Sequence, residues 1–434
     1  MPQPSRCPMN YPDTYYSRTL TERKERPALS GSVDCDTVVI GGGLAGLTTA
    51  LQLARAGQKV VVLEAKSVGF GASGRNGGFV SAGYATGVEQ IARMSSAETA
   101  RQLYLMSIEG VDFVRDTIAR LGISGADPVD GVTSVMRYDD GAGMRSHASE
   151  VRRMYGQQLE YLDMVRVRQN LKSARYFHGL RDRKAFHIHP LNYLRGITDE
   201  IERLGGVICE NSPAVSTDLA PYRKQVRTSN GAVIARTVVF ATGGYTGRLN
   251  PRLKRAMLPI ATYVMVSEEA PQLIASAITT RDGIGDNRRA GDYYRLVDGG
   301  RRLLWGGRIT TRSASTAGLV QELRREMTNT YPQLRDLKTE LAWSGLMAYA
   351  RHLMPQIGEM QPGVWHCTAF GGHGLNTTAI GGKVVAEAIL GQSNRHHLFT
   401  PFGLDWAGGV AGLAVAQLTY WKLQAQDWWR ERAA

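Results

Sequence analysis

The chain has 434 residues, of which 43% are hydrophobic and 21% charged, a composition typical of a soluble globular enzyme with one to three domains. Its start lacks an apolar segment of signal-peptide length and its four cysteines lie far apart, so we expect a cytoplasmic protein with reduced thiols, without a disulfide framework or a metal site. The net charge of +13 is spread thinly and no nucleic-acid-binding motif accompanies it, which favours anionic substrates or a membrane surface as partners over nucleic acid.

The first predicted elements form a strand–helix–strand unit. Residues 37–41 are an unbroken apolar run typical of a buried strand, and residues 44–56 place their leucines on one face of a helix. Residues 59–65 predict the next strand. Glu64, followed by Ala65, stands at the end of that strand, where a carboxylate can accept hydrogen bonds from a ribose.

The turn between the first strand and the helix contains Gly41, Gly43 and Gly46 at GxGxxG spacing. Gly41 permits a tight turn, Gly43 lets the backbone approach a pyrophosphate, and Gly46 lets the helix pack closely on the strand. The phosphates would lie at the helix N-terminus, beside Leu44 and Ala45. This unit predicts a dinucleotide site, but it does not decide between NAD and FAD.

A glycine- and serine-rich loop, VGFGASGRNGGFVSAG, follows at residues 68–83. Its small residues allow a flat ring system to lie against backbone amides, and the guanidinium of Arg75 can contact a phosphate. The loop therefore favours a flavin over a nicotinamide. Its candidate cofactor contacts are Gly71, Ala72, Ser73, Arg75, Asn76, Gly77 and Gly78.

Further elements follow along the chain. We expect mainly helix over residues 96–172 and a glycine-terminated helix over 197–206. Strands are predicted at 235–244, where a turn follows, and at 263–269 and 301–310; a glycine-opened helix is predicted at 374–390. Because nucleotide-type elements occur early, in the middle and late, the order indicates a discontinuous nucleotide domain with a second domain inserted into it.

The motifs GASGRNGG at 71–78 and GGHG at 371–374 resemble those of the D-amino-acid-oxidase-like FAD-dependent oxidoreductases, the glycine and sarcosine oxidase type. Within that family the chain is similar to the γ-glutamylputrescine oxidoreductase and bacterial L-pipecolate oxidase branch, from about Tyr11 to about Leu390.

The resemblance implies an α/β (α+β) fold. Its Rossmann-like FAD-binding domain of glutathione-reductase type would be discontinuous, with an inserted substrate domain on a mostly antiparallel sheet. The expected division is 30–100, 186–260 and 345–400 for the FAD-binding domain, 101–185 and 261–344 for the substrate domain, 1–29 for an N-terminal arm, and 401–434 for a helical tail.

The same resemblance assigns later cofactor contacts. Val215 would meet the adenine, and the turn at Thr242 and Gly243 would close over the FAD. The loop at 371–378 would pass the flavin ring, and the helix after it would direct its positive N-terminus at the pyrimidine carbonyl. The contacts implied on this loop are Gly372, Gly374, Leu375, Asn376 and Thr377.

Catalytic candidates are implied in the same way. His373 would lie beside the flavin, and Arg351 would contact a carboxylate or the flavin. Tyr263 and Trp305 belong to the sheet that walls the substrate side of the ring in the family. Arg308, and secondarily Arg295, are further candidates for the substrate carboxylate.

The sequence departs from the sarcosine oxidases at four places. No cysteine lies in 345–352 and no histidine in 71–80, so we expect FAD to be bound non-covalently. Asn376 stands where those enzymes hold the substrate carboxylate with a lysine. No lysine lies in 296–316, where one serving oxygen activation is expected, so either O₂ or a quinone could reoxidise the flavin.

We therefore expect oxidation of a C–N bond in an amine or amino acid by hydride transfer to flavin N5, giving an imine. The expected substrate is L-pipecolate, another secondary amino acid, or a γ-glutamyl-amine. The alternatives are a tRNA-modifying flavoprotein, an NAD(P)-dependent dehydrogenase and a catalytically silent binding subunit. The tail at 407–432 is apolar and then aromatic and basic, which fits either a helix packed on the body or one lying at a membrane surface.

Overall fold

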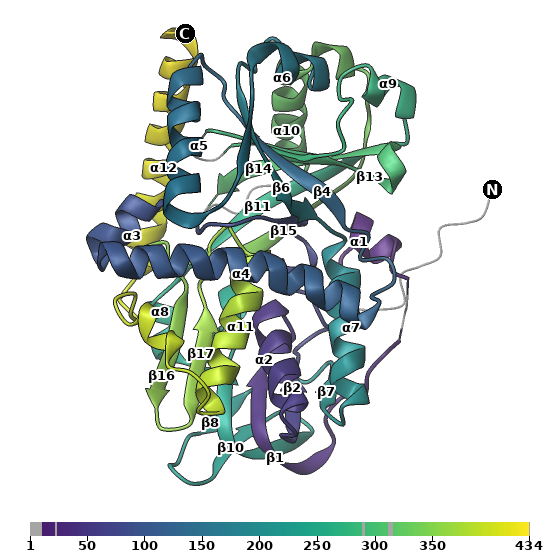
Figure 1. Cartoon of the computed structure of the whole chain (residues 1–434). Helices are drawn as coiled ribbons and strands as arrows, with labels where there is room; N and C mark the ends of the chain where they lie inside the picture. The colour runs from purple at the N-terminus through teal and green to yellow at the C-terminus, as the bar shows by residue number, and fades with distance from the viewer. Residues whose placement is uncertain (1–10, 22–23, 289–290, 311–315, 434) are drawn as a thin grey trace, which may run out of the picture.

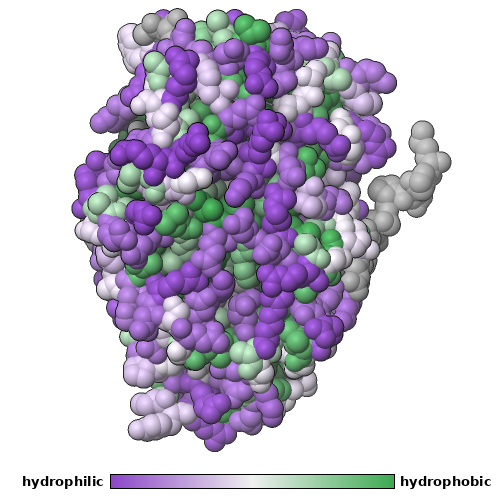
Figure 2. Space-filling view, viewed as in Figure 1, coloured by the Kyte–Doolittle hydropathy of each residue, from purple (hydrophilic) through white to green (hydrophobic). Residues whose placement is uncertain are grey.

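The computed structural model describes residues 11–21, 24–288, 291–310 and 316–433. Two sheets lie one above the other in Figure 1, and the long helix α4 (Ala97–Leu121) runs across the middle of the view. On the face drawn in Figure 2 hydrophilic side chains predominate, and hydrophobic ones gather mainly across the middle. The mixed α/β fold confirms the predicted class.

The first sheet contains the dinucleotide unit. Its strands follow the order β16-β17-β10-β1-β2-β7, and β1 pairs in parallel with both β10 and β2. The bounds are β1 (Gly31–Ile40), β2 (Val60–Leu63), β7 (Val207–Cys209), β10 (Gly231–Phe240), β16 (Gln356–Gln361) and β17 (Val364–Thr368), with β8 (Ser216–Asp218) and β9 (Lys224–Arg227) attached beside β10. The β-branched residues at 37–40 are buried as predicted.

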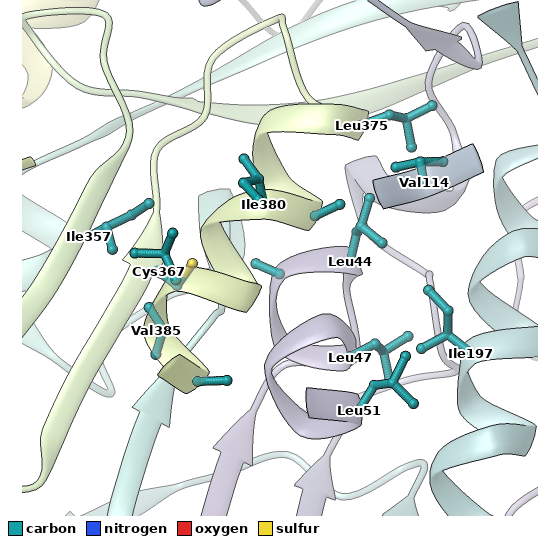
Figure 3. Packing of buried hydrophobic residues seen from close by; sticks show 14 of the residues in the cluster. Leu44, Leu47, Leu51, Val114, Ile197, Ile357, Cys367, Leu375, Ile380 and Val385 are labelled. Atoms are coloured by element: carbon teal, nitrogen blue, oxygen red, sulfur yellow. The ribbon is translucent and has the colours of Figure 1, made fainter. Parts of the chain in front are cut away.

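Three helices cover this sheet and form its core. The helix α2 (Leu44–Arg55) packs against α11 (Leu375–Ile389) and α7 (Pro190–Arg203). Figure 3 shows Leu47 and Leu51 of α2 close to Ile197 of α7, with Ile380 on the neighbouring α11. The helix α4 packs on α11 as well. The two glycine-opened helices, predicted from separate parts of the sequence, therefore stand side by side.

The second sheet is mostly antiparallel, as expected, in the order β15-β11-β14-β13-β12-β4-β6-β3 with β5 beside β6. Its strands are β3 (Phe79–Val80), β4 (Val129–Val135), β5 (Leu159–Leu162), β6 (Gly179–His187), β11 (Leu258–Ser267), β12 (Gly283–Asp286), β13 (Tyr293–Val297), β14 (Arg302–Thr310) and β15 (Thr339–Tyr349). The prediction of mainly helix over 96–172 is confirmed, since α4 and two further helices make up most of that segment, but two strands within it were not predicted. The strands β4 and β5 lie within that segment because they pair with β6, a partner that local periodicity does not reveal.

Shorter helices and a long final helix complete the described chain. The helices not yet mentioned are α1 (Tyr15–Arg18), α3 (Val88–Met94), α5 (Gly141–Tyr155), α6 (Met164–Asn170), α8 (Pro251–Arg255), α9 (Pro271–Ala275), α10 (Thr316–Thr330) and α12 (Gly409–Ala433). No helix in the described ranges combines the length and the apolar character needed to cross a bilayer.

Candidate active site

The turn between β1 and α2 has the backbone geometry that a phosphate site needs. Gly41 has a φ of +112°, and a Cβ there would lie 2.6 Å from the carbonyl oxygen of Ala241, so only glycine fits without strain. Gly43 is the N-cap of α2 and supplies no side-chain cap itself, while the N–H of Leu44 donates to Oγ of Ser73 at 3.0 Å. Unpaired N–H groups and the helix dipole at such a terminus favour an anion.

Glu64 lies beside this turn. Its carboxylate accepts hydrogen bonds from the backbone N–H of Gly42 at 2.8 Å and of Lys66 at 2.9 Å. Burial raises the pKa of the Glu64 carboxyl. Two backbone donors leave the carboxylate with acceptor capacity for a hydroxyl pair, as the ribose role requires.

A cavity of about 680 Å³ extends from this turn along the edge of the first sheet. One end is lined by Gly43 and Glu64, and the other by Gly372 and Gly374, where α11 begins. Gly374 is the N-cap of α11 and also has no side-chain cap. A cavity with a helix N-terminus at each of two places fits an elongated dinucleotide.

A second cavity of about 460 Å³ adjoins the first. Both cavities are bordered by Ala72, Asn76, Met347, Gly372, Gly374 and Leu375. The second cavity extends to the second sheet, where aromatic and neutral polar side chains predominate. These are Phe79, Tyr84, Thr262, Tyr293, Tyr349 and His373.

The strand β15 separates the two cavities. Leu346 and Ala348 line the first cavity, whereas Gly345 and Tyr349 line the second, and Met347 borders both. This follows from the two-residue period of a strand, whose side chains alternate between faces. Burial raises the pKa of Tyr349 to about 12, so its phenol stays protonated at neutral pH.

Two glycines make room for Tyr293. A Cβ on Gly77 would lie 2.5 Å from the Tyr293 ring, and a Cβ on Gly306 would overlap the same ring. Phe79 meets the Tyr293 ring edge-on, with 5.7 Å between the centroids. Gly77 of the glycine-rich loop therefore positions an aromatic wall of the second cavity.

His373 has a defined tautomer. Its Nε2 lies 3.0 Å from the carbonyl oxygen of Ser81 and 3.2 Å from that of Ala82. Because a carbonyl only accepts, Nε2 must carry the proton, which leaves Nδ1 as an acceptor in the neutral ring. Burial lowers the pKa of His373, so the ring is neutral at physiological pH.

Most predicted cofactor residues come together along the two cavities. The first cavity is lined by Gly41, Gly43, Leu44, Ala45, Glu64, Ala65, Gly71, Ala72, Ser73, Asn76, Val215, Thr242, Gly243, Gly372, Gly374 and Leu375. Asn376 lines the second, and its amide donates to the carbonyl oxygen of Ser107 at 3.0 Å.

Three predicted residues line neither cavity. Gly46 faces the Gly41 carbonyl, and Thr377 donates its hydroxyl proton to the His373 carbonyl oxygen. Gly78 has a φ of +84° and faces Arg295, which lies 2.7 Å from where a Cβ would stand. All three support the loops that line the cavities.

Arg75 is placed differently from the prediction. It lines the second cavity and not the first, so the structure does not place it at a phosphate. Its Nε donates to the carbonyl oxygen of Phe70 at 2.6 Å and its Nη1 to that of Ser344 at 3.1 Å. These two contacts hold its guanidinium between the loop and β15.

Tyr263 and Trp305 do not reach the substrate side. Both are buried in an aromatic core on the other face of the second sheet, where Trp305 stacks on Tyr294 with 4.2 Å between the rings. Thr262, the strand neighbour of Tyr263, and Tyr293, the strand neighbour of the buried Tyr294, line the cavity instead. The side-chain alternation of the strands therefore corrects the prediction by one position.

The candidate arginines also differ from expectation. Arg351 is exposed just beyond β15 and lines neither cavity. Arg295 is buried and donates to Tyr16, to His187 and to the backbone of Gly77 and Ile188, so its donors are already used structurally. Arg308 belongs to β14, but its side chain lies outside the described residues, so its role stays a prediction.

The sequence interpretation missed the phenylalanine and the three tyrosines of the second cavity, Phe79, Tyr84, Tyr293 and Tyr349. Phe79 lies in the glycine-rich loop itself, and Tyr349 lies two residues before Arg351 in the segment already singled out. Strand alternation along β15 was the signal that could have found Tyr349.

A dinucleotide cleft that adjoins a second cavity on another sheet defines the class of protein: an oxidoreductase that holds its cofactor beside its substrate. The chain belongs to the DAO family of FAD-dependent oxidoreductases, whose model matches residues 36–388. FAD is thus its cofactor, and the NAD(P)-dependent alternative is set aside.

Individual relatives agree with this assignment. The chain is 32% identical over 388 residues to the γ-glutamylputrescine oxidoreductase of Escherichia coli (strain K12), covering 89% of this chain and 91% of that protein. It is 25% identical to the glycine oxidase of Bacillus licheniformis, covering 82% and 93% of the two chains. The crystal structure of glycine oxidase from Geobacillus kaustophilus has the same fold, with a TM-score of 0.72, 18% identity and coverage of 86% and 99%.

Proposed function

We propose that the chain oxidises the C–N bond of an amine that also carries a carboxylate, by hydride transfer to the flavin, giving an imine. A γ-glutamyl-amine such as γ-glutamylputrescine is the preferred candidate, because the E. coli relative bears that name and shares 32% identity over most of both chains. L-pipecolate and other secondary amino acids are the second candidate. The observation that carries the proposal is the second cavity, which adjoins the flavin end of the first.

FAD supplies the two-electron acceptor when it is bound. The residues around the second cavity supply position and a nearly neutral environment. The aromatic rings of Phe79 and Tyr293 form an apolar wall, which excludes water from the carbon that loses the hydride. Because His373 is neutral and its Nδ1 is an acceptor, this nitrogen can take a hydrogen bond from the substrate amine and orient it. The apolar wall disfavours a charged ammonium and so favours the unprotonated nitrogen that C–H cleavage needs.

The second cavity contains two charged side chains among its described lining residues, Asp286 and Arg75. The Asp286 carboxylate is compensated, since it accepts from Arg288 at 2.6 Å and lies 3.5 Å from Arg137. Arg75 forms no ion pair with a carboxylate among the described residues, and its contacts are two carbonyls and the Phe70 ring at 4.3 Å. Burial lowers the pKa of Arg75.

A half-buried guanidinium without an anionic partner favours an anion in the cavity beside it. We therefore propose Arg75 as the residue that binds the substrate carboxylate. Two of its five N–H groups are engaged by backbone, so the remaining donors are available to a planar carboxylate.

The first test is spectroscopic. The purified protein should be yellow and release FAD on acid precipitation, because the binding is proposed to be non-covalent; FAD that stays with the precipitate would contradict this part. Under anaerobic conditions γ-glutamylputrescine should bleach the flavin. If no amine or amino acid in a panel bleaches it, the proposed function is wrong; bleaching by L-pipecolate alone would select the second candidate. Readmission of O₂, or addition of a quinone, then identifies the electron acceptor.

The second test concerns Arg75. Arg75→Gln should raise KM for the carboxylate-bearing substrate about 10- to 100-fold, the range of a charge-assisted hydrogen bond, and leave the KM for the matching carboxamide almost unchanged. Arg351→Gln is the control, since that arginine is exposed and lines neither cavity. An equal loss for both substrates would show that Arg75 only holds the loop to β15.

A further inference from the structure

The final helix α12 carries an exposed apolar stripe. Val410 is 85% exposed, Val415 and Leu418 are each 61% exposed, and Trp429 is 68% exposed. With 100° between successive residues, these positions and the half-exposed Trp428 fall within an arc of about 140°. Large apolar side chains exposed together along one helix face mark an interaction surface on a soluble protein.

The helix is attached to the body at both ends. Just before α12, the backbone N–H of Ala407 donates to the carbonyl oxygen of Arg255 at 2.8 Å. In the last turn the carboxylate of Glu431 accepts from Nε of the buried Arg137 at 2.9 Å. The stripe is therefore the outer face of a docked helix and not the side of a free tail; α12 lies along the edge of the molecule in Figure 1.

The charges on the outer face are all of one sign. Lys422, Arg430 and Arg432 are exposed, whereas Glu431 is paired with Arg137 and Asp427 is partly buried. The guanidinium of Arg432 lies 3.7 Å from the centre of the Trp428 ring. Exposed tryptophans with flanking cations are the side chains that settle at the headgroup level of an anionic bilayer.

We infer that α12 binds the surface of an anionic lipid membrane, with the stripe of Val410, Val415, Leu418, Trp428 and Trp429 immersed in the interface. The positive net charge of the whole chain adds long-range attraction to the same surface. Insertion across the bilayer is not part of this inference, since the described helices lack the required length and apolar character.

The bound helix would lie next to the catalytic region. Arg137, the partner of Glu431, also lies 3.5 Å from Asp286, which lines the second cavity. Two ion pairs, Glu431 with Arg137 and Arg137 with Asp286, thus connect α12 to the proposed substrate cavity. This arrangement suits an enzyme that exchanges substrate or electrons with a membrane.

The test is co-sedimentation of the FAD-loaded full chain with vesicles of phosphatidylcholine alone and of phosphatidylcholine with phosphatidylglycerol. We expect the wild-type chain to bind the anionic vesicles. In the triple variant Lys422→Gln/Arg430→Gln/Arg432→Gln this binding should weaken on the order of 100-fold, because each of the three cations contributes about tenfold or less. Trp428→Ser/Trp429→Ser should abolish it. The matched control is Val165→Ser/Tyr222→Ser, which removes two other exposed apolar side chains (63% and 93% exposed) and should bind normally.

FAD content and thermal midpoint check that each variant is folded. Failure of the wild-type chain to sediment with anionic vesicles would overturn the inference. So would a dimer in light scattering without lipid that Trp428→Ser/Trp429→Ser converts to monomer, because a second copy would then cover the stripe. None of these measurements requires turnover, so their outcome is independent of the proposed reaction.

Discussion

Gly46 provides the sharpest test of the cofactor cleft, because its role is packing and not contact. A Cβ at Gly46 would lie 3.1 Å from Cγ1 of Val39 and 3.2 Å from Cβ of Ala241, and it would overlap the carbonyl oxygen of Gly41. The oxygen belongs to the backbone of the phosphate turn, so it cannot move aside as a side chain would. Gly46→Ala must therefore displace α2 from β1 or distort the turn.

Overpacking of this kind costs about 1–3 kcal/mol, and a rigid neighbour places Gly46→Ala near the upper end. If the turn absorbs the strain, FAD affinity falls by about 100-fold. If α2 moves instead, the apoprotein loses a similar free energy of unfolding. FAD titration of apoprotein, followed by flavin fluorescence quenching, measures the first, and urea denaturation measures the second.

Gly403→Ala is the control, since a Cβ there would meet no heavy atom within 4 Å and its φ is not in the left-handed region. We expect it to change neither quantity by more than about 0.5 kcal/mol. If Gly46→Ala matched Gly403→Ala in both assays, the close approach of α2 to the turn would not be a requirement of the cleft, and the reasoning would be refuted.

Three further changes test other parts of the structure. Leu47→Ala should lower the free energy of unfolding by about 2–5 kcal/mol in urea denaturation, because Leu47 is fully buried in the core that contains α2 and α11; a loss below 1 kcal/mol would contradict that packing. Trp305→Ala should lower the free energy of unfolding by about 3–5 kcal/mol but leave KM within about twofold of the wild-type value in steady-state kinetics. A large increase in KM at full FAD occupancy would show that Trp305 lies on the substrate side after all. Burial lowers the pKa of His366 to about 4, so the folded state keeps this ring neutral where the unfolded state would protonate it. The contribution of His366 to the free energy of unfolding is therefore fully present above pH 6.5. It is lost as pH falls toward 4, at up to about 1.4 kcal/mol per pH unit. His366→Gln should therefore flatten the dependence of the urea midpoint on pH between 6.5 and 4, and an unchanged slope would refute the assignment.

The nucleotide half of the site could be predicted because its determinants are local. Gly41, Gly43 and Glu64 lie within one strand–helix–strand unit, whose turn geometry follows from short-range sterics and hydrogen bonding. The predicted helix at 44–56 corresponds to α2, and the strand at 59–65 to β2. Sequence spacing is enough to place such residues around one cavity.

The substrate half could not be predicted to the same degree, because strand register decides which side chains face the cavity. Tyr263 and Thr262 are neighbours in β11, and only Thr262 lines the cavity. The two side chains point to opposite faces because those of a strand alternate, and the pairing of β11 with β15 and β14 decides which face meets the cavity. No local pattern around Tyr263 reports that pairing.

Arg75 illustrates the same limit in a loop. Its motif predicted contact with the cofactor, and its position beside the cleft agrees with that motif, but the direction of its guanidinium depends on Ser344, which lies 269 residues further along the chain. The backbone carbonyl of Ser344 turns the side chain toward the second cavity, where no described carboxylate compensates its charge. A contact between distant segments thus makes Arg75, which the loop motif predicted as a phosphate ligand, a candidate for substrate recognition. The loop motif marks the family, but the partner strand β15 determines what Arg75 can bind.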